Sequence, residues 1–246
     1  MVLKHLLPYQ LREAVGRGDP LLVPAGCVET HGPHMAIGHD TLIVEEICRR
    51  VAERTSAVIA PSFDYGPTGY ALGGPVDGTI DPDYASFEPY VKGILRNFLA
   101  MGFRKTYVVI MHQGMDAPLA LAFRKAAAEL AFELPLQKGY PHGWWGMADW
   151  KQKNIEEHDG QIEVCPMILP ESSPPADGDH AAHHETSFLL AARPELVDQS
   201  RLDDNAPWYC RKNGPKNSWN ANAEHGQEMI DAVVNAWICK IDSARE

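Results

Sequence analysis

A short apolar run followed by a loop dense in acids and histidines constrains this chain more than any other feature. The run Leu21–Gly26 reads as a buried strand, and residues 42–54 behind the loop have helical periodicity. The loop between them carries the polar side chains Glu29, His31, His34, His39 and Asp40. Because α/β folds place their chemistry at the ends of buried strands, this stretch predicts a functional site.

Imidazole and carboxylate ligands mixed in this way suit Zn, Mn or Fe(II) rather than Ca or Mg. Glu29 and His31 lie two residues apart, so in extended backbone both side chains can face one ion. Asp40 is expected just before the helix, where its carboxylate can also cap free N–H groups. The alternative is a polar surface loop, but this density of ligands beside a buried strand favours metal binding.

Two further apolar runs, residues 57–61 and 106–111, are expected to form parallel strands because helical segments separate them. The second run ends at His112, the same strand-end position as the acidic and histidine-rich loop. Parallel strands bring their carboxyl ends to one crevice, so His112 is a candidate ligand. A fourth strand is expected at residues 134–137.

The helical segments complete an alternating pattern. They are expected within residues 1–19, at 42–54, from Asp83 or Ser86 to about 98, at 116–132, after a loop in 180–192, and at 227–241. This order predicts a three-layer α/β/α fold with a mostly parallel central sheet, in one domain over residues 1–246. The long loop 62–82 is expected to form a wall of the site or a subunit contact.

Two features leave alternatives open. Residues 139–150 hold three tryptophans and a tyrosine, which suit an aromatic box for a flat or cationic ligand, a hydrophobic lid, or a subunit interface. Cys27 borders the metal loop, and its thiol could be a soft ligand or a nucleophile. The favoured interpretation is that Cys27 is a small residue packed at the strand end.

Composition excludes several classes of protein. The net charge of −11 argues against nucleic acid as a partner, since phosphate contacts need clustered Lys and Arg. No apolar run reaches the ~18 residues of a membrane span, and the N-terminus lacks the pattern of a signal peptide. The five cysteines are widely spaced, which indicates reduced thiols and a cytoplasmic location.

Three motifs resemble the creatininase (creatinine amidohydrolase) family. The first is Glu29-Thr30-His31-Gly32-Pro33-His34 with Asp40-Thr41. The second is Asp179-His180-Ala181-Ala182-His183-His184-Glu185-Thr186-Ser187, followed by Arg193-Pro194-Glu195-Leu196-Val197. The third is Val108-Val109-Ile110-Met111-His112-Gln113-Gly114, where the family carries an apolar strand ending in Asn-Gly-His-Gly-Gly-Asn. The resemblance runs from about Pro24 to near the C-terminus.

The resemblance implies a creatininase-like fold and a metal-dependent amidohydrolase that cleaves a C–N bond of a small, cyclic amide. It implies two divalent ions, Zn and/or Mn with Fe as a further option, held by Glu29, His31, Asp40, His112 and Glu185. Asp40 would bridge the metals, a metal-bridging hydroxide would attack the carbonyl carbon, and His180 would protonate the leaving nitrogen. The family also implies a homo-oligomer, often a hexamer, that acts on a small-molecule substrate.

One departure from the family leaves the ligand set and the substrate open. Creatininase has a ligand Glu two residues after its strand-end histidine, where this chain has Gly114. His183, His184 or Asp116 could therefore contribute to the site. The alternatives are a hydrolase of a lactone, formamide or peptide on the same scaffold, and a non-catalytic metal- or ligand-binding protein.

Overall fold

A computed structural model describes residues 1–137, 139–143, 146–147, 161–172, 179–210 and 216–244. In these residues four strands form one sheet in the order β2-β1-β3-β4. They are β1 (Leu21–Ala25), β2 (Val58–Ile59), β3 (Lys105–Ile110) and β4 (Gln161–Pro166). All pairs are parallel, and Ala25 at the end of β1 is opposite Ile110 at the end of β3. The carboxyl ends of the strands therefore lie at one edge of the sheet.

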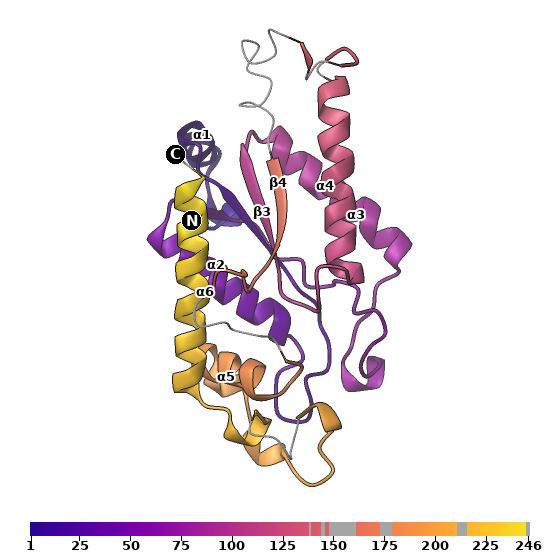
Figure 1. Ribbon diagram of the computed structural model, residues 1–246, viewed down its shortest axis with the longest axis vertical. Helices are drawn as coiled ribbons and strands as arrows, with labels where there is room; N and C mark the ends of the chain where they lie inside the picture. Colours follow the sequence, from indigo (N-terminus) through magenta and orange to yellow (C-terminus); the bar gives the residue numbers. More distant parts are fainter. Residues whose placement is uncertain (138, 144–145, 148–160, 173–178, 211–215, 245–246) are drawn as a thin grey trace.

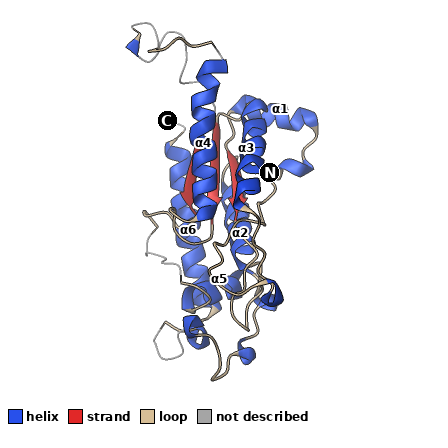
Figure 2. Ribbon diagram, turned by 90° about the vertical axis from the view of Figure 1, so that its right-hand side faces the viewer, coloured by secondary structure: helices blue, strands red, loops and turns tan. Residues whose placement is uncertain are grey.

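Helices cover both faces of this sheet (Figures 1 and 2). The helices are α1 (Pro8–Arg17), α2 (His39–Arg54), α3 (Tyr84–Ala100), α4 (Pro118–Gln137), α5 (His183–Ala192) and α6 (Ala223–Ser243). Short 3₁₀ turns occur at Leu3–His5, Pro75–Asp77, Pro194–Leu196, Gln199–Arg201, Trp208–Cys210 and Ser218–Asn220. The predicted three-layer α/β/α fold with a parallel sheet is confirmed.

Alternation along the strands explains the two layers of helices. Leu22 of β1 and Tyr107 of β3 pack with apolar side chains of α2, α5 and α6 on one face. Val23 of β1 and Val108 of β3 pack with α1, α3 and α4 on the other. Strands buried on both faces read as continuous apolar runs, which is why these segments were recognisable in the sequence. Each fully buried large side chain stabilises the fold by about 1.5–3 kcal/mol.

The prediction of a fourth strand at residues 134–137 is wrong. These residues form the last turn of α4, which also begins slightly later than expected, at Pro118. A run of four residues is too short for periodicity to separate a strand from the end of a helix. The fourth strand is β4, which sequence reasoning missed because its half-buried positions include a charged residue, Glu163.

The helix bounds matter most at the start of α2. The α2 helix begins at His39, so Asp40 lies in its first turn rather than before it, and Gly38 occupies the N-cap position without a side-chain hydrogen bond. The expected capping role of Asp40 is therefore wrong.

The helices α5 and α6 pack with their backbones close together, since a Cβ on Gly226 would collide with the carbonyl oxygen of Ser187.

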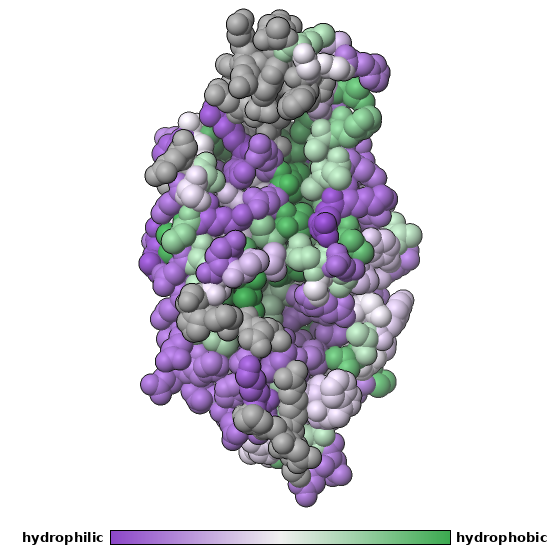
Figure 3. All heavy atoms as spheres, in the orientation of Figure 1, coloured by the Kyte–Doolittle hydropathy of each residue, from purple (hydrophilic) through white to green (hydrophobic). Residues whose placement is uncertain are grey.

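The face presented in Figure 1 is uneven in polarity. Figure 3 shows apolar atoms gathered in a band down its middle, over β4 and between α4 and α6, with hydrophilic atoms on both sides. None of the helices in the described part of the chain combines the length and apolar character that a membrane crossing needs.

Candidate metal centre

The first side chains of the site come from the end of β1 and the start of α2. These two segments approach closely at Gly26, where a Cβ would lie 2.8 Å from the backbone nitrogen of Thr41. Only glycine fits this contact without a shift of the backbone. Cys27 and Glu29, just after β1, are thereby placed against Asp40 in the first turn of α2, and all three are buried.

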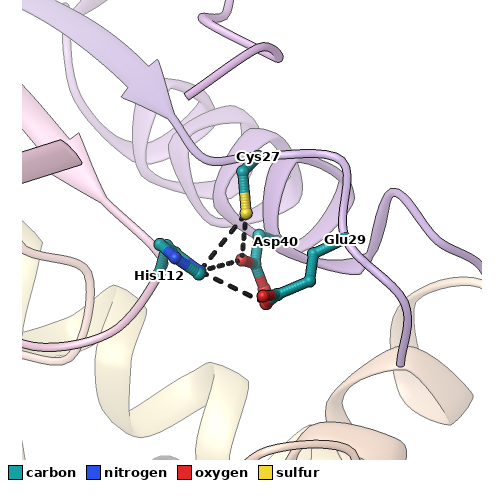
Figure 4. Close-up of side chains that lie close together, drawn as sticks. All are labelled: Cys27, Glu29, Asp40 and His112. Atoms are coloured by element: carbon teal, nitrogen blue, oxygen red, sulfur yellow. Dashed lines mark hydrogen bonds and ion pairs between the residues drawn. The ribbon is translucent and has the colours of Figure 1, made fainter. Parts of the chain in front are cut away.

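One group of potential ligands consists of Cys27, Glu29, Asp40 and His112, whose donor atoms all lie within 4.8 Å of one another. Figure 4 shows the four side chains pointing toward a common centre. His112 Nδ1 lies 2.9 Å from Asp40 Oδ2 and 3.6 Å from Glu29 Oε2. The expected convergence of the ends of β1 and β3 is therefore what the structure shows.

A second group lies on the other side of Asp40 and consists of His31, His39, Asp40 and Glu185. His31 Nε2 is 3.2 Å from Asp40 Oδ1 and 3.5 Å from Glu185 Oε2. His39 precedes Asp40 in α2, and its ring lies 4.7 Å from that of His31. The two groups thus share one carboxylate, which turns a different oxygen toward each.

The orientation of His31 directs its Nε2 toward two carboxylates. Its Nδ1 is 3.0 Å from the backbone carbonyl oxygen of Glu29, which can only accept, so Nδ1 carries the proton. Nε2 faces the carboxylates of Asp40 and Glu185, which favour a proton on it near pH 7, and loss of that proton frees the lone pair for a cation. A metal-binding histidine is normally oriented by this kind of hydrogen bond from its other nitrogen.

Buried atoms without partners point the same way. Glu29 Oε1 is buried and has no hydrogen-bond partner, and His31 Nε2, also buried, has only the carboxylates of Asp40 and Glu185 beside it. Leaving such atoms unsatisfied is costly, and native proteins rarely do so without a reason. Imidazole nitrogens, carboxylates and one thiol are the donors that Zn, Mn and Fe accept, so the residues present fit a pair of divalent cations.

Titration of the group reflects burial and crowding of charges. Burial raises the pKa of Glu29 to about 7 and that of Glu185 to about 8. Burial alone would lower the pKa of His31, but the carboxylate of Asp40 outweighs it and raises this pKa to about 9. Burial alone would raise the pKa of Asp40. This pKa nevertheless lies well below the usual range, because His31 and His112 stabilise the charged carboxylate. Burial and the neighbouring Asp40 also raise the pKa of the Cys27 thiol.

His180 lies beside both groups but is more accessible than the candidate ligands, with 24% of its side chain exposed. Its Nε2 is 3.0 Å from the carbonyl oxygen of Thr30, so this nitrogen donates, and Nδ1 is the acceptor. Nδ1 lies 3.9 Å from Glu29 Oε2. Burial, followed by the charge of His31, lowers the pKa of His180 to about 4, which keeps the ring neutral near pH 7.

The turn before α5 holds Glu185 in place. Asp179 accepts hydrogen bonds from the backbone N–H groups of His184 and Glu185, and Glu185 Oε2 accepts one from the N–H of Ala181 at 2.7 Å. Ala181 has a φ of 48°, and Gln113, just after His112, has a φ of 47°. Non-glycine residues in this region are strained, and such strain is typical of functional sites. Sequence reasoning missed Asp179 as a positioning residue.

A pocket of about 560 Å³ opens beside the two groups. It is lined by Glu29, Asp40, Ala71, Leu72, Ile110, Met111, His112, Gln113, Pro166, Met167, Ile168, Asp179, His180 and Glu185. The loop 62–82 supplies Ala71 and Leu72, so the structure places this loop in the wall of the pocket. A volume of this size suits a small molecule.

Other predicted candidates lie elsewhere. His34 binds Thr186 through its Nε2 at 2.9 Å rather than facing the centre. Asp116 is exposed and paired with Arg124, so the prediction that it could contribute to the ligand set is wrong. The rings of His183 and His184 pack against His225, and no ligand group among the described residues includes them.

Sequence reasoning favours Cys27 as a packed small residue and leaves His39 out of the ligand set. The structure places both residues in groups of potential ligands. The signal for His39 was its place next to Asp40, at the start of a helix. Trp144, Trp145 and Trp150 of the aromatic segment lie outside the described residues.

Comparison with known proteins identifies several relatives of this chain. The creatinine amidohydrolase of Pseudomonas putida is 29% identical over 204 residues, 81% of this chain and 74% of that protein. The 3-dehydro-scyllo-inosose hydrolase of Thermotoga maritima is 30% identical over 198 residues, 80% of this chain and 58% of that protein. A mycofactocin precursor peptide peptidase of Mycolicibacterium smegmatis is 29% identical over 195 residues, 76% of this chain and 64% of that protein. The matches thus span less than two thirds of the latter two relatives.

Solved structures show the same fold. A structure described as "Creatininase Mn" superimposes with a TM-score of 0.75 at 23% identity, covering 99% of this chain and 98% of that one. A creatininase mutant described as Zn-Zn type gives a TM-score of 0.73 at 23% identity, covering 99% of this chain and 97% of that one. The family model for creatininase, described as creatinine amidohydrolase, matches residues 5–241. This chain therefore belongs to the creatininase family and is a hydrolase of that family.

Proposed function

We propose that this protein is a metal-dependent amidohydrolase that hydrolyses a C–N bond of a small, cyclic amide. The observation that carries the proposal is the position of Asp40 between two groups of ligands. Its Oδ2 faces His112 and its Oδ1 faces His31, at 2.9 and 3.2 Å. A carboxylate shared in this way is suited to bridge two cations, with Glu29 and His112 on one side and His31 and Glu185 on the other.

The names of the related structures support divalent cations, since one is described as Mn and another as Zn-Zn type. Two such ions supply Lewis acidity for a carbonyl oxygen and lower the pKa of a water. The chain's own part is to hold the ligands rigid and to keep bulk water away from them. Residues Ile110, Met111 and Met167 line the pocket beside the ligands and supply this apolar wall.

His180 supplies the proton transfer in this proposal. Its neutral ring keeps Nδ1 as an acceptor, because Nε2 donates to the backbone of Thr30. Nδ1 takes a proton from the attacking water and gives it to the leaving nitrogen as the C–N bond breaks. The products are then a carboxylate and an amine, and the histidine returns to its neutral form.

A substrate panel and chelation test the proposal together. The purified protein is assayed against creatinine, cyclic imides, lactones and formamides, before and after removal of metal by a chelator. We expect hydrolysis of a cyclic amide that is lost with the metal and restored by Zn²⁺ or Mn²⁺. Full activity after complete removal of metal would refute metal dependence.

A second candidate is a hydrolase of another small carbonyl compound on the same scaffold. The observation that favours it is that relatives named for creatinine, an inosose and a peptide are almost equally similar to this chain, at 29–30% identity. Turnover of lactones or formamides, with none of cyclic amides, would select this candidate. Metal binding without hydrolysis of any substrate in the panel would instead select a non-catalytic binding protein.

Assembly and location remain proposals as well. We propose a homo-oligomer, because large apolar side chains such as Val76 and Trp208 are 96% and 84% exposed, and a hexamer as its size on the family resemblance alone. Light scattering after size-exclusion chromatography measures the mass directly. All five cysteines are free thiols, which supports a reducing compartment such as the cytoplasm.

A further inference from the structure

We propose that the sulfur of Cys27 is a metal ligand, which completes the set Cys27, Glu29, Asp40 and His112 and gives this half of the centre a preference for Zn²⁺. The inference deepens the proposed function and rests on it, because it concerns one of the two proposed cations. It assigns a donor that lies outside the ligand set implied by the family resemblance.

The position of the sulfur is the first argument. Cys27 Sγ lies 3.1 Å from Asp40 Oδ2 and 3.2 Å from His112 Nδ1. The ring nitrogen lies 3.6 Å from Glu29 Oε2. Around a tetrahedral Zn²⁺ with bonds of ~2.0–2.3 Å, two donor atoms lie about 3.3–3.6 Å apart. The donors are therefore already near the spacing of a four-ligand zinc site (Figure 4).

The surroundings of the sulfur are the second argument. Cys48 and Cys165 are members of a hydrophobic cluster, whereas neither hydrophobic cluster of the described residues includes Cys27. Cys27 is nevertheless 0% exposed, and it faces a carboxylate and an imidazole. A cysteine that served only as a small apolar residue would pack among apolar side chains.

The neighbouring ligands supply an independent third argument. Glu29 and His112 are 1% and 6% exposed, and Glu29 Oε1 has no hydrogen-bond partner. Glu29 Oε1 belongs to the carboxylate that faces the same centre as the sulfur. Buried, unpartnered oxygen beside an imidazole and a thiol calls for a cation rather than for further apolar packing.

The donor set then decides the metal. A thiolate is a soft ligand that favours Zn²⁺, whereas Mn²⁺ is favoured by sets of oxygen and imidazole donors. At Gly114, two residues after His112, the chain offers no side chain to add a further carboxylate. The group around His31 and Glu185 has no sulfur. The two halves of the centre should therefore differ in metal preference.

Spectroscopy of the cobalt-loaded protein tests the inference. The full chain is stripped with a chelator, loaded with Co²⁺ alone and measured in the near ultraviolet and visible. We expect two bound ions per chain and a thiolate-to-cobalt charge-transfer absorption. This absorption should be absent in Cys27→Ser and Cys27→Ala, and present in Cys48→Ala, which removes a buried thiol of the hydrophobic cluster.

Zinc affinity provides a second readout that does not use activity. Competition with a chromophoric chelator should show that Cys27→Ser weakens one of the two Zn²⁺ ions by at least ~10-fold, since even outer partners of a metal site contribute about 10–100-fold. The same variant should bind Mn²⁺ at least as well as the wild type. Cys48→Ala should leave both affinities unchanged.

The outcomes separate this inference from the proposed function. Two bound Co²⁺ ions without charge-transfer absorption in the wild type, or absorption that persists in Cys27→Ser, would overturn the role of Cys27 and leave the metal centre intact. A protein that binds no cation at all would overturn both. If the Cys27 variants fail to fold, an absorption that persists when each of Cys48, Cys165, Cys210 and Cys239 is replaced by Ala supports Cys27, and its absence in the wild type overturns the inference.

Discussion

The two ligand groups that meet at Asp40 are built on different parts of the fold. Cys27 and His112 each lie two residues beyond the paired positions Ala25 and Ile110, so the register of β1 and β3 brings them together. Glu185, in contrast, lies in the first turn of α5 and reaches His31 only because that helix starts at His183. One group is thus a product of the sheet, and the other depends on how a helix docks.

The difference also concerns chemistry. The sheet-derived group combines a thiol with carboxylates and one imidazole, whereas the helix-derived group combines two imidazoles with carboxylates. The first is placed by backbone hydrogen bonds of the sheet core. The second is held by local contacts, including those of Asp179 to the backbone of α5. We expect the two halves to respond differently to mutation, pH and choice of metal.

The largest effect is expected from Asp40→Asn, because this variant weakens both groups at once. Turnover should fall at least about 10³-fold, since the cations supply several kcal/mol of transition-state stabilisation. Elemental analysis should show that bound metal falls in parallel. Asp116→Asn, a change at an exposed carboxylate, is the control and should have no effect. Two tightly bound ions in Asp40→Asn would break the idea of a shared ligand.

His180→Gln is expected to lower turnover by about 10²–10⁴-fold while both ions stay bound, because the change removes a proton carrier rather than a ligand. Steady-state kinetics and metal analysis of the same sample provide the two measurements. Loss of one ion would contradict this role and would place His180 in the group with Glu29 and His31, which its position also permits.

Metal affinity should rise with pH in both halves of the centre, including the half that contains His31 and Glu185. The pKa values of these residues are raised to about 9 and about 8, so both hold protons that a cation must displace at pH 7. As the pH falls from about 8 to about 6, affinity should drop roughly tenfold per unit for each proton displaced. Zinc competition assays at several pH values measure the slope. An affinity independent of pH over this range would contradict the prediction.

The smallest effect is expected from Gly26→Ala, which tests the contact that joins the strand to α2. Its Cβ would lie 2.8 Å from the backbone of Thr41, so the helix start must shift, at a cost of about 1–3 kcal/mol. Thermal unfolding should show a melting temperature lowered by several degrees. Gly93→Ala, inside α3 and with nothing within 4 Å of its Cβ, is the matched control and should not destabilise the protein.

The first half of the centre could be predicted from local pattern. Apolar runs that are followed by Glu29 and His112 suffice to place ligands at one edge of a parallel sheet, because strand ends converge whatever the helices do. The family resemblance pointed to Glu185, but spacing alone did not. If the helix began at His180, Glu185 would lie on a different face of the helix from His180.

Other errors have the same origin in local ambiguity. Residues 134–137 continue a helix, and β4 was missed because Glu163 interrupts its apolar character. Cys27 is buried at the strand end, as its favoured interpretation predicts, but its polar neighbours could not be read from the local sequence. Only the position of α2, set at Gly26, puts Asp40 beside the sulfur.

By itself, the sequence determined the order of the first three strands and of the helices, the parallel sheet and the two segments that carry most of the ligands. Hydrophobic periodicity and the clustering of acids and histidines are local properties, and they can be read without coordinates. The tertiary structure alone decided that Asp40 faces both groups and that Asp179 holds Glu185. The physical reason is that these contacts join residues far apart in the chain, through packing that no local pattern encodes.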